Sequence, residues 1–388
     1  MRHIALLGST GSIGKNALKV IQAHADRLRL VGVAAGDNLE LLSRQIRDFD
    51  PPLVSVKTRQ SAEKIKAQFP SKDILHGSAG LEAMVSDPRV DTVIAAISGT
   101  DPLRAILAAI RGRRRLCLAN KETVVAAGKL LMAEVERSQA ELLPLDSEQC
   151  AIFQCLENRD RNFVRKVILT ASGGPFFRRH PDSFATITPS EALAHPTWSM
   201  GGKITIDSAT LVNKAFEMIE AFHLFRLRSD QIDVLIHPQS VVHSLVEFVD
   251  ASLIAQLSRT DMRIPILYSL SYPERIDGGM PPLDLAGLKN LEFFPVDAVR
   301  FPAVELARRV LTTGDNAGAV FEAANEVAVS CFMKRKISFR RIVAVVDHML
   351  AQTVAFPIDS VEDVEQTVEC TRRETAAYIE KGVKQWQD

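Results

Sequence analysis

The chain has 388 residues, enough for two or three domains, and its 46% hydrophobic and 24% charged residues are typical of globular proteins. Basic and acidic residues number 47 each, so the zero net charge argues against a nucleic-acid or anionic-membrane partner. No apolar run approaches the length of a membrane helix, and the first strand begins too early for a signal peptide. The five cysteines form no CxxC pair, so we expect reduced thiols and a cytoplasmic protein.

The first predicted element is a short buried strand at residues 3–7. Residues 8–14 (GSTGSIG) follow it directly, and the spacing of Leu18, Val20 and Ile21 then indicates a helix. A strand, a glycine-rich turn and a helix start form the phosphate cradle of dinucleotide-binding folds. The glycine spacing is G-x-x-G-x-x-G instead of the common G-x-G-x-x-G, so a tight turn without a ligand is the alternative. The position at the first βα turn favours the cradle.

Strands and helices alternate through the rest of the N-terminal region. We predict strands at 28–34, 53–56, 93–97, 116–118 and 142–145, and helices at 39–48, 61–68, 103–111 and 122–137. This alternation is typical of a parallel sheet, so residues 1–146 are expected to form a Rossmann-like α/β domain.

Two polar segments follow strands of this sheet and are expected to face the cofactor. Residues 34–38 (AAGDN) end the second strand, where an acidic residue binds the ribose hydroxyls of NAD and a basic one binds the extra phosphate of NADP. Asp37 by itself favours NAD. Residues 120–122 (NKE) begin a later helix. A lysine is slightly disfavoured there, so Lys121 indicates a nearby anion, and a solvated lysine is the alternative.

Three carboxylates are candidates for a metal site. Asp146 and Glu148 follow the strand end at 142–145, and in an extended segment they would point to the same side. Glu217 joins them from a later helix. Oxygen ligands without cysteine favour magnesium or manganese over zinc. The alternative is that Asp146 and Gln149 form a capping box for a helix at 150–156, which does not exclude metal binding.

Residues 195–202 (HPTWSMGG) contain a proline and a glycine pair that prevent long regular structure. Trp198 and Met200 lie between these hinges, so we interpret the segment as a flap that closes over a ligand. The alternative is a surface loop that buries Trp198 in the core.

After the flap we predict a strand at 203–206 and then a helix, capped at residue 207 or 208, that runs to about residue 224. On this helix Asn213 and Glu217 share a face. An ordinary solvated face with a Lys214–Glu217 ion pair is the alternative. Three side chains are suitable donors for a phosphate: Ser208, Asn213 and Lys214.

The region 147–271 has fewer helices between its strands, which we predict at 164–170, 234–236 and 241–249. This pattern predicts an α+β catalytic domain, and its sheet could cover a partner subunit. Ser172 lies in the turn ASGGP and either contributes to a phosphate site or is a simple turn serine. We expect His237 and His243 to be packed strand residues.

The remaining chain divides by composition. Residues 272–302 are rich in proline and glycine and are predicted to be a linker. Residues 303–388 show helical periodicity at 304–311, 317–332, 339–353 and 361–386, which predicts a C-terminal helical bundle.

Seven ordered stretches together resemble the 1-deoxy-D-xylulose 5-phosphate reductoisomerase family. They are GSTGSIG at 8–14, LANKE at 118–122, LPLDSE at 143–148, ASGGPF at 171–176, HPTWSMG at 195–201, DSATLVNKAFEMIEA at 207–221 and IHPQSVVHS at 236–244. The resemblance implies an NADPH-dependent enzyme of non-mevalonate isoprenoid biosynthesis that uses Mg²⁺ or Mn²⁺ and forms a homodimer. It would rearrange 1-deoxy-D-xylulose 5-phosphate by a retroaldol/aldol isomerisation and reduce the product to 2-C-methyl-D-erythritol 4-phosphate.

The resemblance also implies a role for individual residues. The metal ligands would be Asp146, Glu148 and Glu217. Catalytic roles would fall to Glu148, Lys121, His195 and Lys214. The substrate would contact Lys121, Ser147, Glu148, Ser172, His195, Trp198, Ser208, Asn213, Lys214 and Glu217, and Met200 would help Trp198 to cover it. NADPH would contact Thr10, Gly11, Ser12, Ile13, Gly36, Asp37, Asn38, Asn120, Glu122 and Gly201.

The sequence departs from the family pattern at three places. Asp37 stands where many relatives have a basic or neutral residue, which bears on the choice between NADPH and NADH. Gly202 replaces a usual basic residue, so we expect a looser flap. Ala215 and Phe216 replace a Gly-Leu pair, which changes packing beside Glu217.

Two other functions are compatible with the nucleotide-binding pattern. One is a different nicotinamide-dependent dehydrogenase, such as a semialdehyde dehydrogenase with a nucleophilic cysteine. The other is a non-catalytic nucleotide-sensing protein, which would bind the cofactor without needing the three carboxylates.

Overall fold

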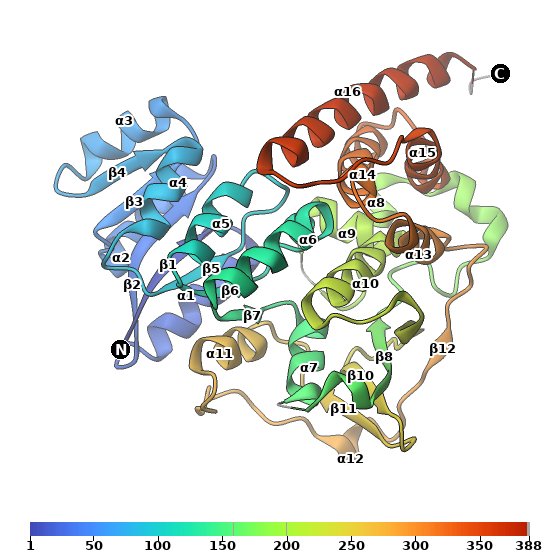
Figure 1. Ribbon diagram of the computed structural model, residues 1–388, viewed down its shortest axis with the longest axis horizontal. Coiled ribbons are helices and arrows are strands. Elements are labelled where there is room, and N and C mark those ends of the chain that lie inside the picture. The colour runs from blue at the N-terminus through green and yellow to red at the C-terminus, as the bar shows by residue number, and fades with distance from the viewer. Residues whose placement is uncertain (158, 199, 386–388) are drawn as a thin grey trace. The chain divides into compact units, whose positions relative to one another are not determined.

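The computed structural model describes residues 1–157, 159–198 and 200–385, and the side chains of all of these except 383–385. Ser199 of the predicted flap and Trp386 at the end of the last predicted helix lie outside the described residues. The chain forms two compact units (Figure 1). Unit 1 comprises Met1–Thr123, Leu131–Cys150 and Asp261–Pro281, and unit 2 comprises Val124–Leu130, Ala151–Thr260 and Pro282–Asp388.

Unit 1 is built on a seven-stranded parallel sheet in the order β4-β3-β2-β1-β5-β6-β7. The last four residues of the central strand, Ile4 to Leu7, are apolar and fully buried, as expected for a strand covered on both faces. The predicted Rossmann-like parallel sheet is thus confirmed. Its strands are β1 (Arg2–Leu7), β2 (Leu28–Ala35), β3 (Leu53–Val56), β4 (Asp73–His76), β5 (Thr92–Ala95), β6 (Arg115–Leu118) and β7 (Leu142–Pro144).

Helices connect these strands, and the sequence missed one strand–helix pair, β4 and α4. Strand β4 has only four residues and none of them is buried, so its hydrophobic signal is weak. The helices are α1 (Ser12–Ala23), α2 (Leu39–Phe49), α3 (Arg59–Gln68), α4 (Gly77–Ser86), α5 (Leu103–Arg111), α6 (Lys121–Ser138) and α7 (Ser147–Leu156). Both α6, which kinks at Ala127, and α7 contribute residues to each unit.

Helix α11 (Arg263–Ser271) belongs to unit 1, although the sequence analysis placed it in the region 147–271. Hydrogen bonds explain this: the Arg115 guanidinium of β6 donates to the carbonyl of Tyr272 at 2.7 Å, and Ser269 Oγ donates to the carbonyl of Pro144 at 2.9 Å. Glu141 neutralises Arg115 at 2.6 Å. The four-part division into 1–146, 147–271, 272–302 and 303–388 stays a prediction.

Unit 2 contains a mixed five-stranded sheet in the order β11-β10-β8-β9-β12. Strands β8 and β9 are parallel and the other pairs are antiparallel, in agreement with the α+β character predicted here. Two short edge strands, β11 and β12, were not predicted, and β12 lies within the supposed linker. The strands are β8 (Val164–Ala171), β9 (Ile232–Ile236), β10 (Val242–Phe248), β11 (Leu253–Leu257) and β12 (Phe294–Pro295).

The helices of unit 2 confirm the predicted C-terminal helical region. Its long helices are α13 (Ala303–Thr313), α14 (Ala317–Met333), α15 (Phe339–Gln352) and α16 (Val361–Gln385), coloured orange to red in Figure 1. The others are α8 (Pro189–Ala192), α9 (Gly202–Ala209), α10 (Val212–Phe225), α12 (Leu285–Leu288), and the short 3₁₀ helices Arg161–Phe163, Pro181–Thr186 and Ser229–Gln231.

One hydrophobic core joins the middle of the chain to its C-terminal helices. Phe176 and Phe184 come from the segment after β8, and each packs against Phe339 of α15, with ring centroids 5.1 and 6.0 Å apart. Phe332 of α14 and Phe301 complete the aromatic group. The central and C-terminal regions therefore fold around the same core.

The predicted strand at 203–206 is wrong, because these residues form the middle of helix α9. Only four residues supported the alternation, and Thr205 and Ile206 are both buried, which a half-exposed strand does not allow. The predicted cap at residue 207 or 208 is also wrong, since both residues lie near the C-terminal end of α9. Helix α10 begins at Val212, after Leu211 in a left-handed conformation.

The two histidines predicted to be packed residues are both buried. His237, directly after β9, stacks on Phe293 at 4.7 Å, and its Nδ1 atom lies 2.8 Å from the carbonyl oxygen of Glu292. The Nε2 atom of His243 in β10 lies 2.9 Å from Ser258 Oγ.

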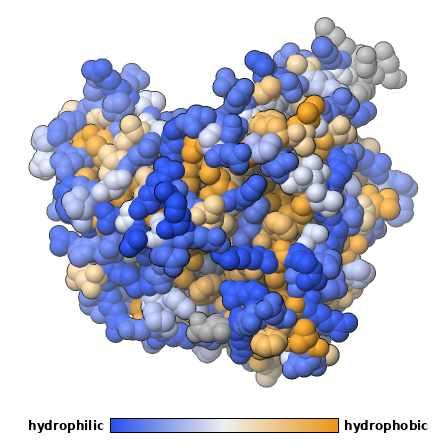
Figure 2. All heavy atoms as spheres, viewed as in Figure 1, coloured by the Kyte–Doolittle hydropathy of each residue, from blue (hydrophilic) through white to orange (hydrophobic). Residues whose placement is uncertain are grey.

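Hydrophilic residues cover much of the face shown in Figure 2, interrupted by smaller hydrophobic groups. This matches a chain with equal numbers of acidic and basic residues. Among the described residues, no helix combines the length and the apolar character that crossing a membrane requires.

A close helix contact in unit 2 gives a stability prediction. A Cβ atom on Gly318 of α14 would lie 2.0 Å from the carbonyl oxygen of Val125 in α6, so the backbones must separate. We expect Gly318→Ala to lower the free energy of unfolding by about 1–3 kcal/mol, despite alanine's better helix propensity. Urea denaturation measures this change. Gly36→Ala is the control, because no atom lies near that position, and an equal loss there would contradict the contact argument.

Candidate active site

The first βα turn is shaped by two glycines. Gly8 follows β1 with φ +93°, and a Cβ atom there would lie 2.5 Å from the carbonyl oxygen of Ala96. A Cβ atom on Gly14 would lie 2.3 Å from the carbonyl oxygen of Gly8, so only glycine lets α1 start this close to the turn. Gly11 precedes α1 and adds no side-chain cap. The first N–H groups of a helix point away from it, so a helix start that follows such a turn is suited to bind a phosphate. The predicted cofactor residues Thr10, Gly11, Ser12 and Ile13 form this turn and helix start.

The end of β2 presents the next predicted cofactor residues. Gly36, Asp37 and Asn38 are exposed. Asn38 caps α2, because its Oδ1 atom accepts a hydrogen bond from the N–H of Leu41 at 3.1 Å. The Asp37 carboxylate is thus left at the surface of the strand end, where it would meet the ribose of a bound dinucleotide.

Asn120 links the loop after β5 to the start of α6. Its Oδ1 atom accepts from the N–H of Thr123 at 2.7 Å, while its Nδ2 group donates to the carbonyl oxygens of Gly99 and Ile97. The oxygen and the NH₂ group of its side chain are therefore both used in hydrogen bonds within the protein, so a cofactor would contact the backbone of Asn120. Glu122, two residues on, is also buried.

Lys121 is not the solvated lysine of the alternative interpretation. Its side chain is 6% exposed, and its Nζ atom lies 3.2 Å from Asp146 Oδ2. Burial of an ammonium group requires a paired anion, and Asp146 supplies it. This pair brings the start of α6 beside the segment that follows β7.

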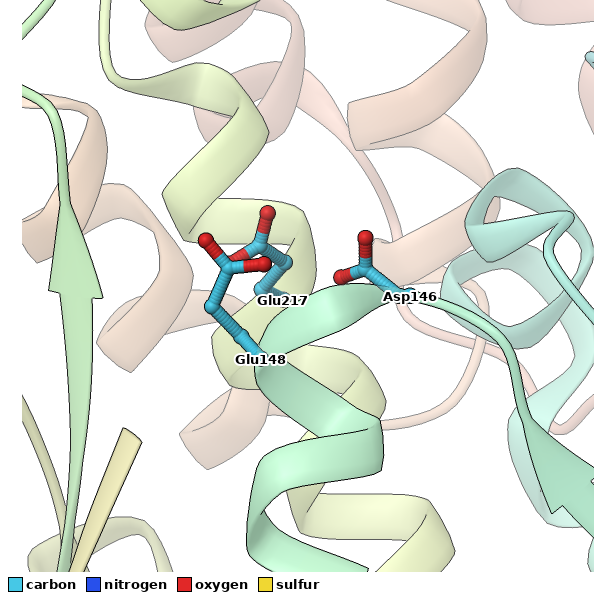
Figure 3. A group of neighbouring side chains, drawn as sticks. All are labelled: Asp146, Glu148 and Glu217. Carbon is cyan, nitrogen blue, oxygen red and sulfur yellow. The ribbon is translucent and has the colours of Figure 1, made fainter. Parts of the chain in front are cut away.

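The three candidate carboxylates lie together (Figure 3). One oxygen each of Asp146, Glu148 and Glu217 lies within 4.8 Å of the others. Asp146 immediately precedes α7, Glu148 is in its first turn, and Glu217 projects from α10. Because α7 begins at Ser147, three residues before the predicted start, the extended geometry assumed for Asp146 and Glu148 is wrong. The helix start nevertheless directs both toward Glu217.

Hydrogen bonds orient two of these carboxylates. Ser147 Oγ donates to Glu148 Oε2 at 2.6 Å. Asn213 Nδ2 donates to Glu217 Oε1 at 2.5 Å, and Lys214 pairs with Glu217 Oε2. Lys214 and Glu217 are 3% and 1% exposed, so their pair is buried and not the solvated face of the alternative interpretation.

The donor chemistry of this group fits a hard divalent cation. Three like charges within 4.8 Å repel one another unless a cation neutralises them. All the donors are carboxylate oxygens, which Mg²⁺ and Mn²⁺ prefer and which suit zinc less well.

A second polar group lies in unit 2. Ser172 is in the turn after β8, Ser208 is in α9, and the Nε2 atom of His195 lies 3.1 Å from the hydroxyl oxygen of each. Gly174 N–H donates to Ser172 Oγ at 3.2 Å, so the turn orients this hydroxyl. The group offers one imidazole and two hydroxyls to a ligand.

His195 also orders the beginning of the flap. Its Nδ1 atom accepts hydrogen bonds from the N–H groups of Thr197 at 3.1 Å and Trp198 at 2.9 Å. An accepting Nδ1 places the ring proton on Nε2, which then donates toward a serine. Burial lowers the pKa of His195, so the imidazole is neutral near pH 7. Beyond Trp198, the half-buried Met200 and the exposed Gly201 lead into α9.

The sequence analysis did not identify Asn325 as relevant to this region. Its side chain is fully buried in α14 and donates to Asp207 of α9 at 2.7 Å. An amide among the mostly apolar residues of 317–333 was the available signal, since a buried polar group requires a partner.

The Rossmann-like sheet with its glycine cradle, together with the carboxylate group, defines a nucleotide-dependent oxidoreductase that uses a divalent cation. Three family models match successive parts of the chain. They describe 1-deoxy-D-xylulose 5-phosphate reductoisomerase over residues 4–128, its C-terminal domain over residues 142–225, and the DXP reductoisomerase C-terminal domain over residues 257–374. The chain therefore belongs to the 1-deoxy-D-xylulose 5-phosphate reductoisomerase family.

Individual relatives are similar over nearly the full length. The reductoisomerase of Anaeromyxobacter dehalogenans is 48% identical over 380 residues, covering 98% of this chain and 97% of the relative. That of Ralstonia nicotianae is 45% identical over 386 residues, with 98% of each chain covered.

Solved structures agree with this relationship. A DOX-P reductoisomerase in complex with NADPH, fosmidomycin and magnesium superposes with a TM-score of 0.93 at 38% identity, covering 98% of both chains. The Zymomonas mobilis enzyme in complex with NADPH gives a TM-score of 0.92 at 38% identity, covering 98% of this chain and 99% of that one.

The neutral state of His195 gives a pH prediction. Its pKa is lower when folded than when unfolded, so between the two values the unfolded chain binds the proton and the folded chain does not. This group's contribution to stability is therefore lost as the pH falls from the ordinary histidine range toward the folded pKa. We expect His195→Gln to lose less stability than wild type between pH 7.5 and pH 5.5, measured by urea denaturation.

The difference in stability loss between wild type and His195→Gln reports on His195 alone. His223, whose pKa burial lowers to about 4, destabilises both proteins equally at low pH. Equal losses in wild type and His195→Gln would show that His195 is not held neutral by its surroundings.

Proposed function

We propose that this chain converts 1-deoxy-D-xylulose 5-phosphate to 2-C-methyl-D-erythritol 4-phosphate with NADPH and a divalent metal ion, as an enzyme of non-mevalonate isoprenoid biosynthesis. The observation that carries the proposal is the convergence of Asp146, Glu148 and Glu217 within 4.8 Å. It supports metal-assisted chemistry in a chain whose family relatives have been solved with NADPH and with magnesium.

Asp146, Glu148 and Glu217 would hold Mg²⁺ or Mn²⁺. When bound, such an ion polarises oxygens of the substrate and acidifies a hydroxyl group. Around it, Ser147 orients Glu148 and Asn213 orients Glu217, while the paired ammonium groups of Lys121 and Lys214 lie beside Asp146 and Glu217. We assign Lys121, Glu148, His195 and Lys214 to the catalytic machinery.

The substrate phosphate is assigned to the donors of unit 2. Ser172, His195 and Ser208 already converge, with both hydroxyl oxygens 3.1 Å from the imidazole. Asn213 and Lys214 extend this set from the start of α10. Trp198 and Met200 in the flap would cover the substrate and exclude water.

The reaction divides into isomerisation and reduction. A carbon–carbon bond of the sugar phosphate breaks and the fragments rejoin in a new arrangement as an aldehyde, which NADPH then reduces by hydride transfer. A held phosphate keeps both fragments in place between these steps. The neutral His195, with its proton on Nε2, orients the serine hydroxyls and adds no charge of its own.

The cofactor is assigned to the turn of residues 10–13, the β2 end at residues 36–38, Asn120, Glu122 and Gly201. Asp37 is the residue that bears on selectivity, because a carboxylate binds ribose hydroxyls well and repels the 2′-phosphate of NADPH. We therefore expect measurable use of NADH beside the preferred NADPH.

The observed cysteines weaken the semialdehyde dehydrogenase alternative. Burial raises the pKa of Cys117 to about 12 and that of Cys155 to about 11, so both are protonated and poor nucleophiles at neutral pH. A nucleotide-sensing protein, in turn, leaves the three grouped carboxylates without a role.

Oxidation of NADPH by purified protein with 1-deoxy-D-xylulose 5-phosphate, followed by absorbance, tests the function. We expect turnover only with Mg²⁺ or Mn²⁺, and slower turnover with NADH. Glu217→Gln should reduce kcat/KM by at least about 100-fold while Kd for NADPH stays unchanged, because one metal ligand loses its charge. Glu305→Gln removes an exposed carboxylate of α13 as the matched control. Metal-independent turnover, or an unaffected Glu217→Gln variant, would remove these carboxylates from the reaction.

We also propose a homodimer that forms through the edge of the unit 2 sheet. Strand β11 pairs with β10 on one side, and apolar side chains are exposed at this end of the sheet: Leu253 of β11 at 52%, Val249 just after β10 at 61% and Phe163 just before β8 at 57%. An exposed apolar strand edge is suited to pair with a second copy.

Light scattering coupled to gel filtration tests the dimer. We expect twice the 42.7 kDa chain mass for wild type and the single-chain mass for the Phe163→Lys, Leu253→Lys double variant. The control is Val299→Lys, which charges another exposed apolar position. A wild-type protein with the single-chain mass at micromolar concentration would contradict the proposal.

A cytoplasmic location is proposed from the cysteines, since all five are described and none of them is in a disulfide. Recovery of the protein from the periplasmic or membrane fraction of its host would contradict it.

A further inference from the structure

Helix α9 is joined to the core of unit 2 by a buried polar cluster. Asp207 is 2% exposed and Asn325 is fully buried. Asn325 Nδ2 donates to Asp207 Oδ1 at 2.7 Å, and Lys203 Nζ lies 3.1 Å from Asp207 Oδ2. The ammonium group also lies 4.9 Å from the ring centroid of Phe216. Both carboxylate oxygens of Asp207 thus have a partner: Lys203 of α9 lies beside Oδ2, and Asn325 of α14 donates to Oδ1.

One of the two links to Asp207 restrains the orientation of α9. The link to Lys203 lies within the helix and cannot fix the helix relative to its surroundings. The link to Asn325 comes from α14, more than a hundred residues further along the chain, and it sets how α9 is rotated and how far it is displaced. A buried hydrogen bond to a charge is short and directional, so it is suited to this role.

The restrained helix carries part of the candidate phosphate site. Ser208 directly follows Asp207, and its hydroxyl meets His195 Nε2 at 3.1 Å. The turn that holds Ser172 also lies against α9, because a Cβ atom on Gly174 would be 3.1 Å from the carbonyl oxygen of Ser208 and from the Cα atom of Ala209. A shift of α9 therefore moves one hydroxyl and presses on the turn that carries the other.

We propose that Asp207 and Asn325 are positioning residues that hold α9 in place so that Ser172, His195 and Ser208 converge on the phosphate group of the substrate. The inference rests on the proposed function for the identity of the substrate. Recognition of a phosphate by this group is tested separately below. Neither Asp207 nor Asn325 touches the ligand; both act through Ser208.

The neighbouring residue on α14 provides a matched control. Glu326 pairs with Arg372 of α16 at 2.7 Å, and both side chains are partly exposed. Glu326→Gln therefore removes the ionic character of a link between α14 and another helix without affecting α9. A general loosening of α14 would appear in this variant as well as in variants of Asn325.

The test variants are Asn325→Leu, which keeps the branched shape of the side chain and removes the donor, and the exchange Asp207→Asn with Asn325→Asp, which is measured together with its two single variants. The exchange keeps one amide, one carboxylate and the net charge, so the hydrogen bond can form in the opposite direction. For Asn325→Leu we expect KM for 1-deoxy-D-xylulose 5-phosphate to rise about tenfold or more, the usual effect of losing a hydrogen bond to a charged group. KM for NADPH and kcat should change by less than about threefold, because the lost interaction is uniform binding of substrate and transition state.

A second measurement does not depend on turnover. Trp198 lies beside His195 in the flap, and the other tryptophan is Trp386. In a Trp386→Phe background, the Kd of inorganic phosphate is read from Trp198 fluorescence. We expect Asn325→Leu to weaken phosphate binding by about the same factor as it raises KM, and Glu326→Gln to leave phosphate binding unchanged. The exchange variant should bind phosphate nearly as tightly as wild type.

The outcomes separate the two proposals. Absence of turnover in wild type would overturn the proposed function, yet the phosphate titrations would still decide the positioning role. Wild-type phosphate affinity in folded Asn325→Leu, or an equal loss in Glu326→Gln, would overturn it. If Asn325→Leu fails to fold, the exchange variant decides. A loss of phosphate affinity in the exchange variant equal to the sum of the losses from its two single substitutions would also contradict the proposal. Wild type that does not respond to phosphate overturns it as well.

Discussion

The candidate active site depends on compensating the electrostatic repulsion among three carboxylates that lie close together. Asp146, Glu148 and Glu217 repel one another at separations within 4.8 Å, and Glu217 is almost fully buried. Lys121 pairs with Asp146 and Lys214 pairs with Glu217, so the five groups carry a formal charge of minus one in place of minus three. A divalent cation would make the group net positive. The site is then suited to bind an anionic substrate and to stabilise negative charge that develops during the reaction.

Several features of the fold serve to place these charges. Strand β7 ends at Pro144, which carries Asp146 to the carboxyl edge of the parallel sheet, where ligands of such sheets are expected. Helix α7 starts directly afterwards, so Glu148 lies in a first helical turn, a position that favours a negative charge. Lys121 follows the neighbouring strand β6 in the same way. Sheet topology alone therefore brings Lys121 to Asp146.

The sequence predicted the parts of the fold that have strong local signals. The strand–glycine–helix start at residues 3–21 and the alternation up to residue 145 were recognisable because buried parallel strands are continuous apolar runs. Residues 203–206 were misread because four alternating residues do not distinguish a strand from a helix turn buried on two sides. The location of α11 in unit 1 depends on Arg115, Glu141 and Ser269, and no local pattern reveals contacts over such a separation.

The same limit applied to the candidate site. Residue types indicated the carboxylates and the candidate phosphate donors, but their partners depended on tertiary structure. Lys121 was interpretable as solvated from the sequence, whereas the structure pairs it with Asp146. Asn325 shows the point most clearly, because an amide in an apolar helix predicts a buried partner without identifying it. The partner, Asp207, is itself one of the two residues that were predicted to cap a helix. A side chain interpreted locally as a cap instead joins α9 to α14, so a C-terminal helix contacts the helix that carries Ser208 of the candidate site.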